Sequence, residues 1–236
     1  MERPRIPTHV RGFDEAVGGG LPEGYVVLVA GAPGTMKSSL AFSVAYHNAL
    51  RDGRNGVYFT LEQSKESLLE HAASLGMSDE AALGRLTVLD MGSIRKNLSF
   101  LQGRGTWFEL FKVHCTNVIK ADRQSILVVD SLDVLETMAR MADRRTDLYF
   151  LFEWLRDLGP LTLLVSERPA DAGPGAAAEE AYLADGVVQL SMEPMPEFQM
   201  QRRIRIVKLR ATRHDTGIYE LAWGPSGFEV DRPRSP

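Results

Sequence analysis

Short hydrophobic runs recur along the chain and alternate with segments of helical spacing. Most of the runs are continuous, as in strands buried on both faces of a sheet; they cover Tyr25–Ala30, Val57–Leu61, Leu86–Asp90, Ile126–Val129, Leu161–Ser166 and Val187–Leu190. The segments between them indicate helices over Ser38–Leu50, Glu66–Ser74, Trp107–Ile119 and Thr146–Leu158. This order predicts an α/β fold, with a mostly parallel twisted sheet flanked by helices.

The pattern changes after Arg202. Three further runs follow, separated by turn residues, at Arg203–Arg210, Ile218–Ala222 and Phe228–Val230. They predict a C-terminal antiparallel meander added to the same sheet. Because neither an internal repeat nor an interdomain linker interrupts the chain, we expect a single domain over residues 1–236.

Three stretches fit neither pattern. Gly92–Gly105 is basic and polar, Asp171–Glu180 is small and acidic, and Met192–Gln201 carries three methionines. We interpret all three as surface loops. For Met192–Gln201, a subunit contact is a second interpretation, because methionine adapts well to interfaces.

Composition excludes several functional classes. The 236 residues are 44% hydrophobic and 25% charged, and their net charge of −4 gives no global basic field for nucleic acid or anionic lipid. The single cysteine, Cys115, excludes an intramolecular disulfide framework and a thiolate zinc cluster. No uninterrupted apolar stretch approaches the roughly 18 residues of a membrane span, so we expect a cytoplasmic protein without membrane contact.

A phosphate-binding loop is the strongest local signal. Gly31, Ala32, Pro33, Gly34, Thr35, Met36, Lys37 and Ser38 follow a predicted strand and open a predicted helix that continues through Ser39. In this context, called Walker A, backbone N–H groups surround phosphate oxygens, the lysine reaches the terminal phosphates and the hydroxyl binds Mg²⁺. Met36 replaces the usual glycine, and its side chain must therefore point away from a nucleotide. A chance glycine-rich turn is the alternative.

Two carboxylates follow other predicted strands. Asp130 ends an apolar run and is the candidate Mg²⁺ ligand, acting through water. Glu62 follows the strand after the Walker A helix and is the candidate base for the attacking water, with Gln63 beside it as a hydrogen-bonding group. On spacing alone, the alternative is an ordinary strand end for Asp130 and a solvated acid at a helix start for Glu62.

Together these residues resemble the KaiC-like ATPases of the RecA superfamily, and the resemblance covers nearly the whole chain. It rests on Arg5–Asp14, Gly18–Gly24, Val129–Leu132, Leu164–Glu167, Asp185–Val188 and Val207–Arg210 with the later Gly217. It implies a RecA-like P-loop domain that binds ATP and Mg²⁺. It also implies slow hydrolysis in a homo-oligomeric ring, expected to be a hexamer, with ATP between neighbouring subunits.

The resemblance further implies that Lys208 and Arg210 reach the γ-phosphate bound by the adjacent subunit. In an extended strand these two residues point to one face, with Cα atoms about 6.6 Å apart. Two cations there can neutralise a transferring phosphoryl group. Without the family, a solvated basic strand is the preferred interpretation, given the arginines nearby.

Departures from the family keep other functions open. The family's usual acidic pair is replaced here by Glu62 and Gln63, which leaves one carboxylate, and Met36 replaces the last glycine of the phosphate loop. A nucleotide-gated scaffold with little hydrolysis is therefore one alternative. A DNA-acting ATPase of the same superfamily is another. However, of its candidate loops, Thr137–Asp147 has only a modest excess of arginine and Arg168–Tyr182 has three acids against one arginine, so we do not expect nucleic-acid binding. The leading expectation is an ATPase that acts on an unidentified protein partner, with autophosphorylation left open.

Overall fold

One mixed sheet organises the molecule. The computed structural model describes residues 3–92, 106–168, 179–196 and 199–231. The sheet runs in the order β11 (Gly227–Asp231), β10 (Ile218–Gly224), β9 (Gln199–Leu209), β8 (Gly186–Met195), β3 (Val26–Gly31), β7 (Leu161–Ser166), β6 (Ile126–Asp130), β4 (Gly56–Thr60) and β5 (Leu86–Asp90). Strands from β8 to β5 are parallel, and β9, β10 and β11 form the antiparallel meander.

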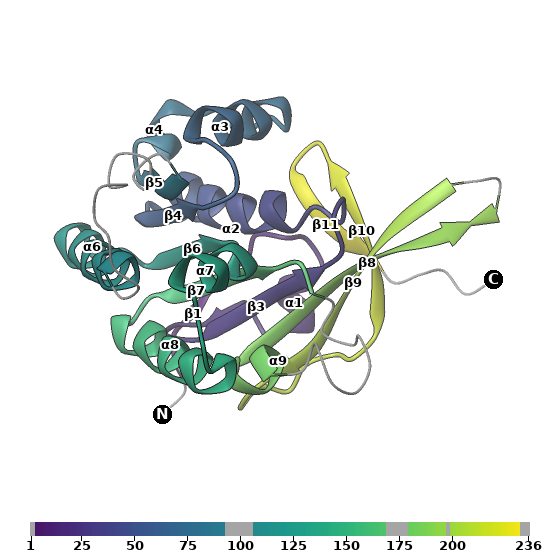
Figure 1. The fold of residues 1–236 in the computed structure, drawn as a ribbon. Coiled ribbons are helices and arrows are strands. Elements are labelled where there is room, and N and C mark those ends of the chain that lie inside the picture. The colour runs from purple at the N-terminus through teal and green to yellow at the C-terminus, as the bar shows by residue number, and fades with distance from the viewer. Residues whose placement is uncertain (1–2, 93–105, 169–178, 197–198, 232–236) are drawn as a thin grey trace.

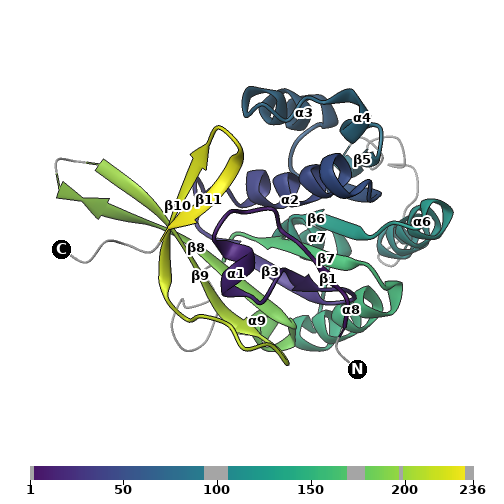
Figure 2. The same ribbon diagram turned by 180° about the vertical axis from the view of Figure 1, so that it is seen from behind.

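Helices cover both faces of the sheet (Figures 1 and 2). One core cluster packs under α1 (Phe13–Ala16), α2 (Lys37–Asp52), α3 (Lys65–Ser74) and α4 (Glu80–Leu83), and the other packs under α6 (Thr106–Asp122), α7 (Leu132–Ala139), α8 (Arg144–Leu158) and α9 (Glu179–Leu183). In β3, Val27 and Val29 point to the first cluster and Val26 and Leu28 to the second. The continuous hydrophobic runs are thus explained, because successive residues of each central strand are buried on opposite faces.

The fold class and the predicted elements are confirmed. Each predicted strand and helix forms, and the largest shifts are the end of β8, at Met195 instead of Leu190, and the start of β9, at Gln199 instead of Arg203. A separate two-stranded sheet, β1 (Arg5–Ile6) with β2 (Leu21–Pro22), was not predicted, nor were the short helices α1, α4, α7 and α9. Several of the helices begin at capped residues. The side chains of Ser64, Asp79 and Asp143 each accept a hydrogen bond from a backbone N–H in the first turn that follows.

Two of the loop predictions are wrong in part. Met192–Met195 extends β8 and Gln199–Gln201 opens β9, so this stretch forms a hairpin that projects from the body of the molecule (Figure 1). Pro194, which lacks an N–H, and Glu193 hid the strand pattern there. Glu179 and Glu180 lie in α9, and Glu180 is buried. The remaining predicted loop residues, 93–105, 171–178 and 197–198, lie outside the described residues.

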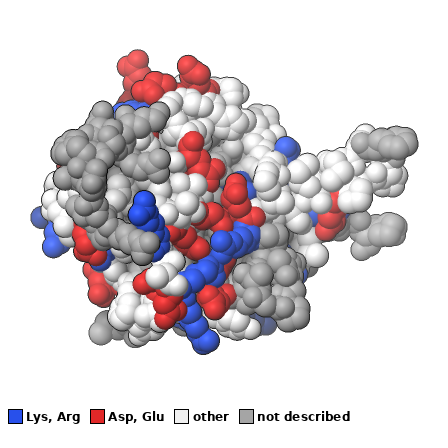
Figure 3. Space-filling model, viewed as in Figure 1, with Lys and Arg blue, Asp and Glu red and all other residues white. Residues whose placement is uncertain are grey.

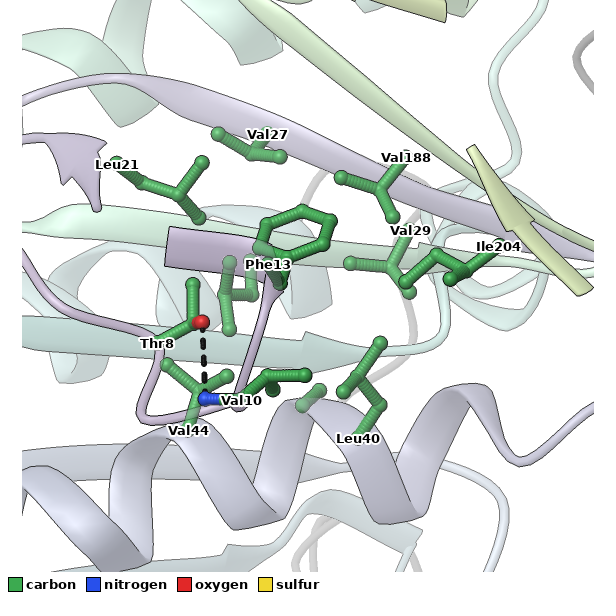
Figure 4. Close-up of a pocket in the computed structure, with 12 residues that line it drawn as sticks. Thr8, Val10, Phe13, Leu21, Val27, Val29, Leu40, Val44, Val188 and Ile204 are labelled. Carbon is green, nitrogen blue, oxygen red and sulfur yellow. Dashed lines mark hydrogen bonds between the residues drawn. The ribbon is translucent and has the colours of Figure 1, made fainter. Parts of the chain in front are cut away.

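A small apolar cavity of about 20 Å³ lies between β3 and α2 (Figure 4). Val27 and Val29 of β3 face it from the sheet, Leu40 and Val44 face it from α2, and Phe13 of α1 also lines it. The Thr8 hydroxyl at its edge accepts a hydrogen bond from the Val10 N–H. The cavity therefore offers no unpaired polar group that would hold a water molecule, and it is a packing defect beneath the helix that follows the phosphate loop.

Candidate nucleotide-binding site

Four neighbouring parallel strands deliver polar residues to one edge of the sheet. β3, β7, β6 and β4 are adjacent and point the same way, so their carboxyl ends meet. The predicted phosphate loop follows β3, Glu167 follows β7, Asp130 ends β6, and Glu62 lies two residues beyond β4. Parallel α/β sheets bind ligands at this edge.

The phosphate loop has the backbone geometry of a strand-to-helix turn. A Cβ atom on Gly31 would lie 2.4 Å from the Leu190 carbonyl oxygen, so only glycine fits there. Gly34 and Met36 both have positive φ, of 83° and 71° respectively. Met36 immediately precedes α2, and its half-buried side chain packs against the core cluster under α2. The chain thus adopts a glycine-type conformation at the one position where the glycine of the motif is missing.

Lys37 is buried and interacts electrostatically with four carboxylates. It is 8% exposed, and its Nζ donates to the Ala32 carbonyl oxygen at 3.1 Å. Burial lowers the pKa of Lys37, whereas the charges of Glu167, Asp130, Glu62 and Asp133 oppose that change. This ammonium group is therefore electrostatically linked to the acids at the ends of three neighbouring strands.

Asp130 is a buried carboxylate held by hydroxyl groups. The Tyr58 hydroxyl donates to its Oδ2, and Ser38 also hydrogen-bonds to it. Burial raises the pKa of Asp130, and the two hydroxyls, with Lys37, act against the rise. Hard oxygen donors of this kind suit Mg²⁺, which takes one or two protein ligands and completes its shell with phosphate and water. The described residues contain no cluster of three or more His, Cys, Asp or Glu side chains able to hold a metal.

Glu62 is tied to the same region. Its Oε1 accepts a hydrogen bond from the hydroxyl of Ser131, the residue after Asp130. The exposed carboxylate is therefore oriented by β6 although it follows β4. Gln63 points elsewhere: its side-chain oxygen accepts from the Ser67 hydroxyl in α3.

Lys208 and Arg210 lie at the opposite end of the parallel strands, where those strands begin. Lys208 pairs with Val187 near the start of β8, and Arg210 contacts Asp185, whose backbone N–H donates to Val26 at the start of β3. The phosphate loop begins at the other end of β3, about 16 Å away at the rise of a strand. The chain thus does not bring these cations to its own phosphate loop. Both donate to the Tyr182 carbonyl oxygen at 2.9 Å, so they share one face as expected.

The sequence alone did not reveal three contacts at this site. Tyr58 is a core residue of β4 with 1% exposure, and a buried tyrosine hydroxyl needs a partner, which here is Asp130. Ser131 was not linked to Glu62. Arg202 of β9 donates from Nε to the Gly34 carbonyl oxygen at 3.3 Å, and only the register of the β8–β9 hairpin places it there.

Cys115 and His114 form no dyad. They are adjacent on α6, where Cys115 is buried and His114 is exposed. Burial raises the pKa of the Cys115 thiol to about 12, so no reactive thiolate forms there. Within the four described ranges, no helix is both long enough and apolar enough to span a membrane.

Comparisons with known proteins bear on the family and the fold of the chain. The family model for the KaiC ATPase matches residues 6–235. A solved structure of a KaiC-like protein from the hyperthermophilic archaeon Pyrococcus horikoshii is similar, with 28% identity and a TM-score of 0.80. The match covers 97% of this chain and 99% of that one.

Longer proteins match as well. The circadian clock protein KaiC2 of Synechocystis sp. is 27% identical over 228 residues, which are 96% of this chain and 40% of that protein. The circadian clock oscillator protein KaiC of Thermostichus vulcanus is 30% identical over 226 residues, covering 92% of this chain and 42% of that protein. The chain thus spans less than half the length of these relatives.

Proposed function

Because the chain belongs to the KaiC family of ATPases, we propose that it binds ATP with Mg²⁺ and hydrolyses it slowly in a homo-oligomeric ring, a hexamer, that regulates a protein partner. One observation carries the ring proposal. The phosphate loop and its acids lie at one edge of the sheet, and Lys208 and Arg210 lie at the other. A nucleotide site that uses all of them needs two copies of the chain.

Within one chain, the loop residues would bind the phosphates. The N–H groups at the start of α2 would donate to phosphate oxygens, and Lys37 would add a positive charge beside the terminal phosphate. Ser38 and Asp130 would hold Mg²⁺, which neutralises charge that develops on the phosphate oxygens. Glu62, oriented by Ser131, would accept the proton of the attacking water.

The neighbouring chain would complete the site with Lys208 and Arg210, which stabilise the charge of the transferring phosphoryl group. Arg202 has a different place. It contacts Gly34 of its own loop, and we assign it to phosphate binding within the same chain.

The alternatives rest on weaker observations. A scaffold with little hydrolysis is favoured by Gln63, which is turned toward Ser67, and by the strained Met36. A DNA-acting ATPase would need free cations near α7 and β7. However, Arg144 and Arg168 there are paired with Glu136 and Asp133, among other carboxylates.

The test of hydrolysis compares purified protein with a Glu62→Gln variant, with and without Mg²⁺. A Glu70→Gln variant, altered at an exposed glutamate of α3, is the control. We expect Mg²⁺-dependent turnover in the wild type and the control, and about a 100-fold loss in Glu62→Gln with unchanged ATP affinity. Equal turnover in all three would reject Glu62 as the base. Bound ATP without turnover in any of them would support the scaffold.

Elution volume with and without ATP tests the ring. We expect a species of several subunits that needs ATP, or is stabilised by it. A monomer under both conditions would reject the role of Lys208 and Arg210 at a neighbouring site.

A further inference from the structure

The two cations proposed to act on the neighbouring subunit are held by α9. Lys208 Nζ donates to the carbonyl oxygens of Ala181 at 3.0 Å and Tyr182 at 2.9 Å. Arg210 donates to Tyr182 and also binds Asp185 at 3.0 Å. Carbonyl groups at a helix C-terminus attract cations, so α9 sets where both side chains lie.

Two arginines of α8 hold α9 in turn: Arg156 donates to the carbonyl oxygen of Leu183, the last residue of α9, and Arg144 holds the first turn. Arg144 donates to Glu180 at 2.7 Å and to Glu179 at 3.1 Å, the first two residues of α9. Glu180 is 1% exposed, so its carboxylate depends on this arginine for a charged partner. The same guanidinium binds both oxygens of Glu136 in α7, each at 2.9 Å.

The contacts continue to the nucleotide site. Glu136 also pairs with Arg168, and Arg168 pairs with Asp133 at 3.1 Å. Asp133 accepts a hydrogen bond at 2.8 Å from the backbone N–H of Glu167, whose charge acts on Lys37. One network of charged groups therefore joins α7, α8, α9 and the end of β7. Figure 3 shows Lys, Arg, Asp and Glu side chains gathered in a band across this face.

We propose that Arg144 is a positioning residue: by fixing α9, it places Lys208 and Arg210 for the nucleotide site of the adjacent subunit. The inference rests on the proposed function, because it presumes that these two cations act on a neighbour. Among the described residues, the Arg144 side chain hydrogen-bonds to Glu136, Glu179 and Glu180, which lie outside the phosphate loop. Four contacts separate Arg144 from Glu167, whose charge acts on Lys37 of its own phosphate loop, whereas Arg144 binds α9 directly, so we expect its main effect in the chain that contributes the cations.

Mixed rings test the proposal. The receiving chain carries Arg210→Ala and keeps its phosphate loop and Glu62. The contributing chain carries Glu62→Gln and keeps Lys208 and Arg210. Neither chain should hydrolyse ATP alone, and a mixture should do so wherever a contributing chain adjoins a receiving one.

Arg144→Gln is then placed in either chain. In the contributing chain we expect the turnover of the mixture to fall by about 10- to 100-fold, the scale of a small misplacement of reacting groups. In the receiving chain we expect a change within about twofold. Arg145→Gln in the contributing chain is the matched control, because Arg145 is exposed beside Arg144. ATP affinity and ring formation are measured for every chain.

Arg144→Gln leaves Glu180 buried without its partner. The double variant Arg144→Gln/Glu180→Gln removes both charges and is used where the single variant does not fold. Absence of turnover in the starting mixture would overturn the shared site and this inference together. Turnover that is insensitive to Arg144 in the contributing chain would overturn this inference alone. An equal loss from either chain would show a purely structural role and also overturn it.

Discussion

Met36 is a side chain in a backbone conformation that favours glycine. Its φ of 71° lies in the left-handed region, which costs a residue with a Cβ atom about 1 kcal/mol or more. The half-buried side chain offsets part of this cost by packing on the core. Stability at this position therefore depends on two opposing contributions, one from the backbone and one from the side chain.

Two substitutions separate these contributions. Met36→Ala and Met36→Gly both remove the packing, but only glycine relieves the backbone. We expect the glycine variant to be more stable than the alanine variant by about 1 kcal/mol, the reverse of their usual order in helices. Urea unfolding of both variants measures the difference. An alanine variant of equal or greater stability would contradict the assignment of strain.

Tyr58 carries a hydrogen bond to a buried charge. Tyr58→Phe removes only the hydroxyl that donates to Asp130, and we expect a loss of about 2 kcal/mol of stability, as is typical for a bond to a charged group. Tyr46→Phe is the control, because that buried hydroxyl accepts a bond from the neutral backbone N–H of Asp79 and should cost about 1 kcal/mol. Equal losses in urea unfolding would argue against an ionised Asp130 in the folded chain.

At the scale of elements, the sequence predicted the strands and helices that have a clear hydrophobic period. Strands such as Ile126–Val129 were readable because both of their faces are buried, and Thr146–Leu158 was readable from its apolar stripe. The short helices α7 and α9 were missed, since five to eight residues hold too little of a period. The hairpin beyond Met192 was missed because its pairing is local to β8 and β9, and no core imposes alternation on it.

Filling the cavity between α2 and β3 should raise the stability of the fold. Val44→Ile adds one methylene beside the cavity of about 20 Å³, and we expect stability to rise by about 0.5 kcal/mol. Val128→Ile makes the same change in β6 at a fully buried position away from the cavity, and should cost about 1 kcal/mol through overpacking. Thermal unfolding compares them. A loss of stability in both variants would show that α2 cannot accommodate the added group.

The contact between β9 and α9 makes stability depend on pH. Burial, with Arg210 beside it, lowers the pKa of Lys208 from 10.5 to about 8. Between these values the unfolded chain binds a proton that the folded chain has released, so the contribution of Lys208 to stability rises with pH in this window and is absent below it. The unfolding free energy of the wild type minus that of Lys208→Gln should therefore increase from pH 8 to pH 10. A constant difference would contradict the lowered pKa.

At the scale of the whole molecule, the sequence identified the candidate groups but not their distribution. The loop, Asp130 and Glu62 each follow a strand, and parallel strands bring such groups to one edge. Lys208 and Arg210 were assigned to a neighbouring subunit from a family resemblance alone. Their distance from the chain's own loop depends on the antiparallel direction of β9, and only the assembled sheet fixes that distance.

The separation of these groups across the sheet makes catalysis depend on the amount of protein. If each site needs parts from two chains, a solitary chain binds nucleotide without the means to turn it over. Turnover per chain would then rise with protein concentration and level off once rings are complete. Dilution alone would abolish turnover, without any inhibitor, and the activity per chain would depend on the concentration of the protein in the cell.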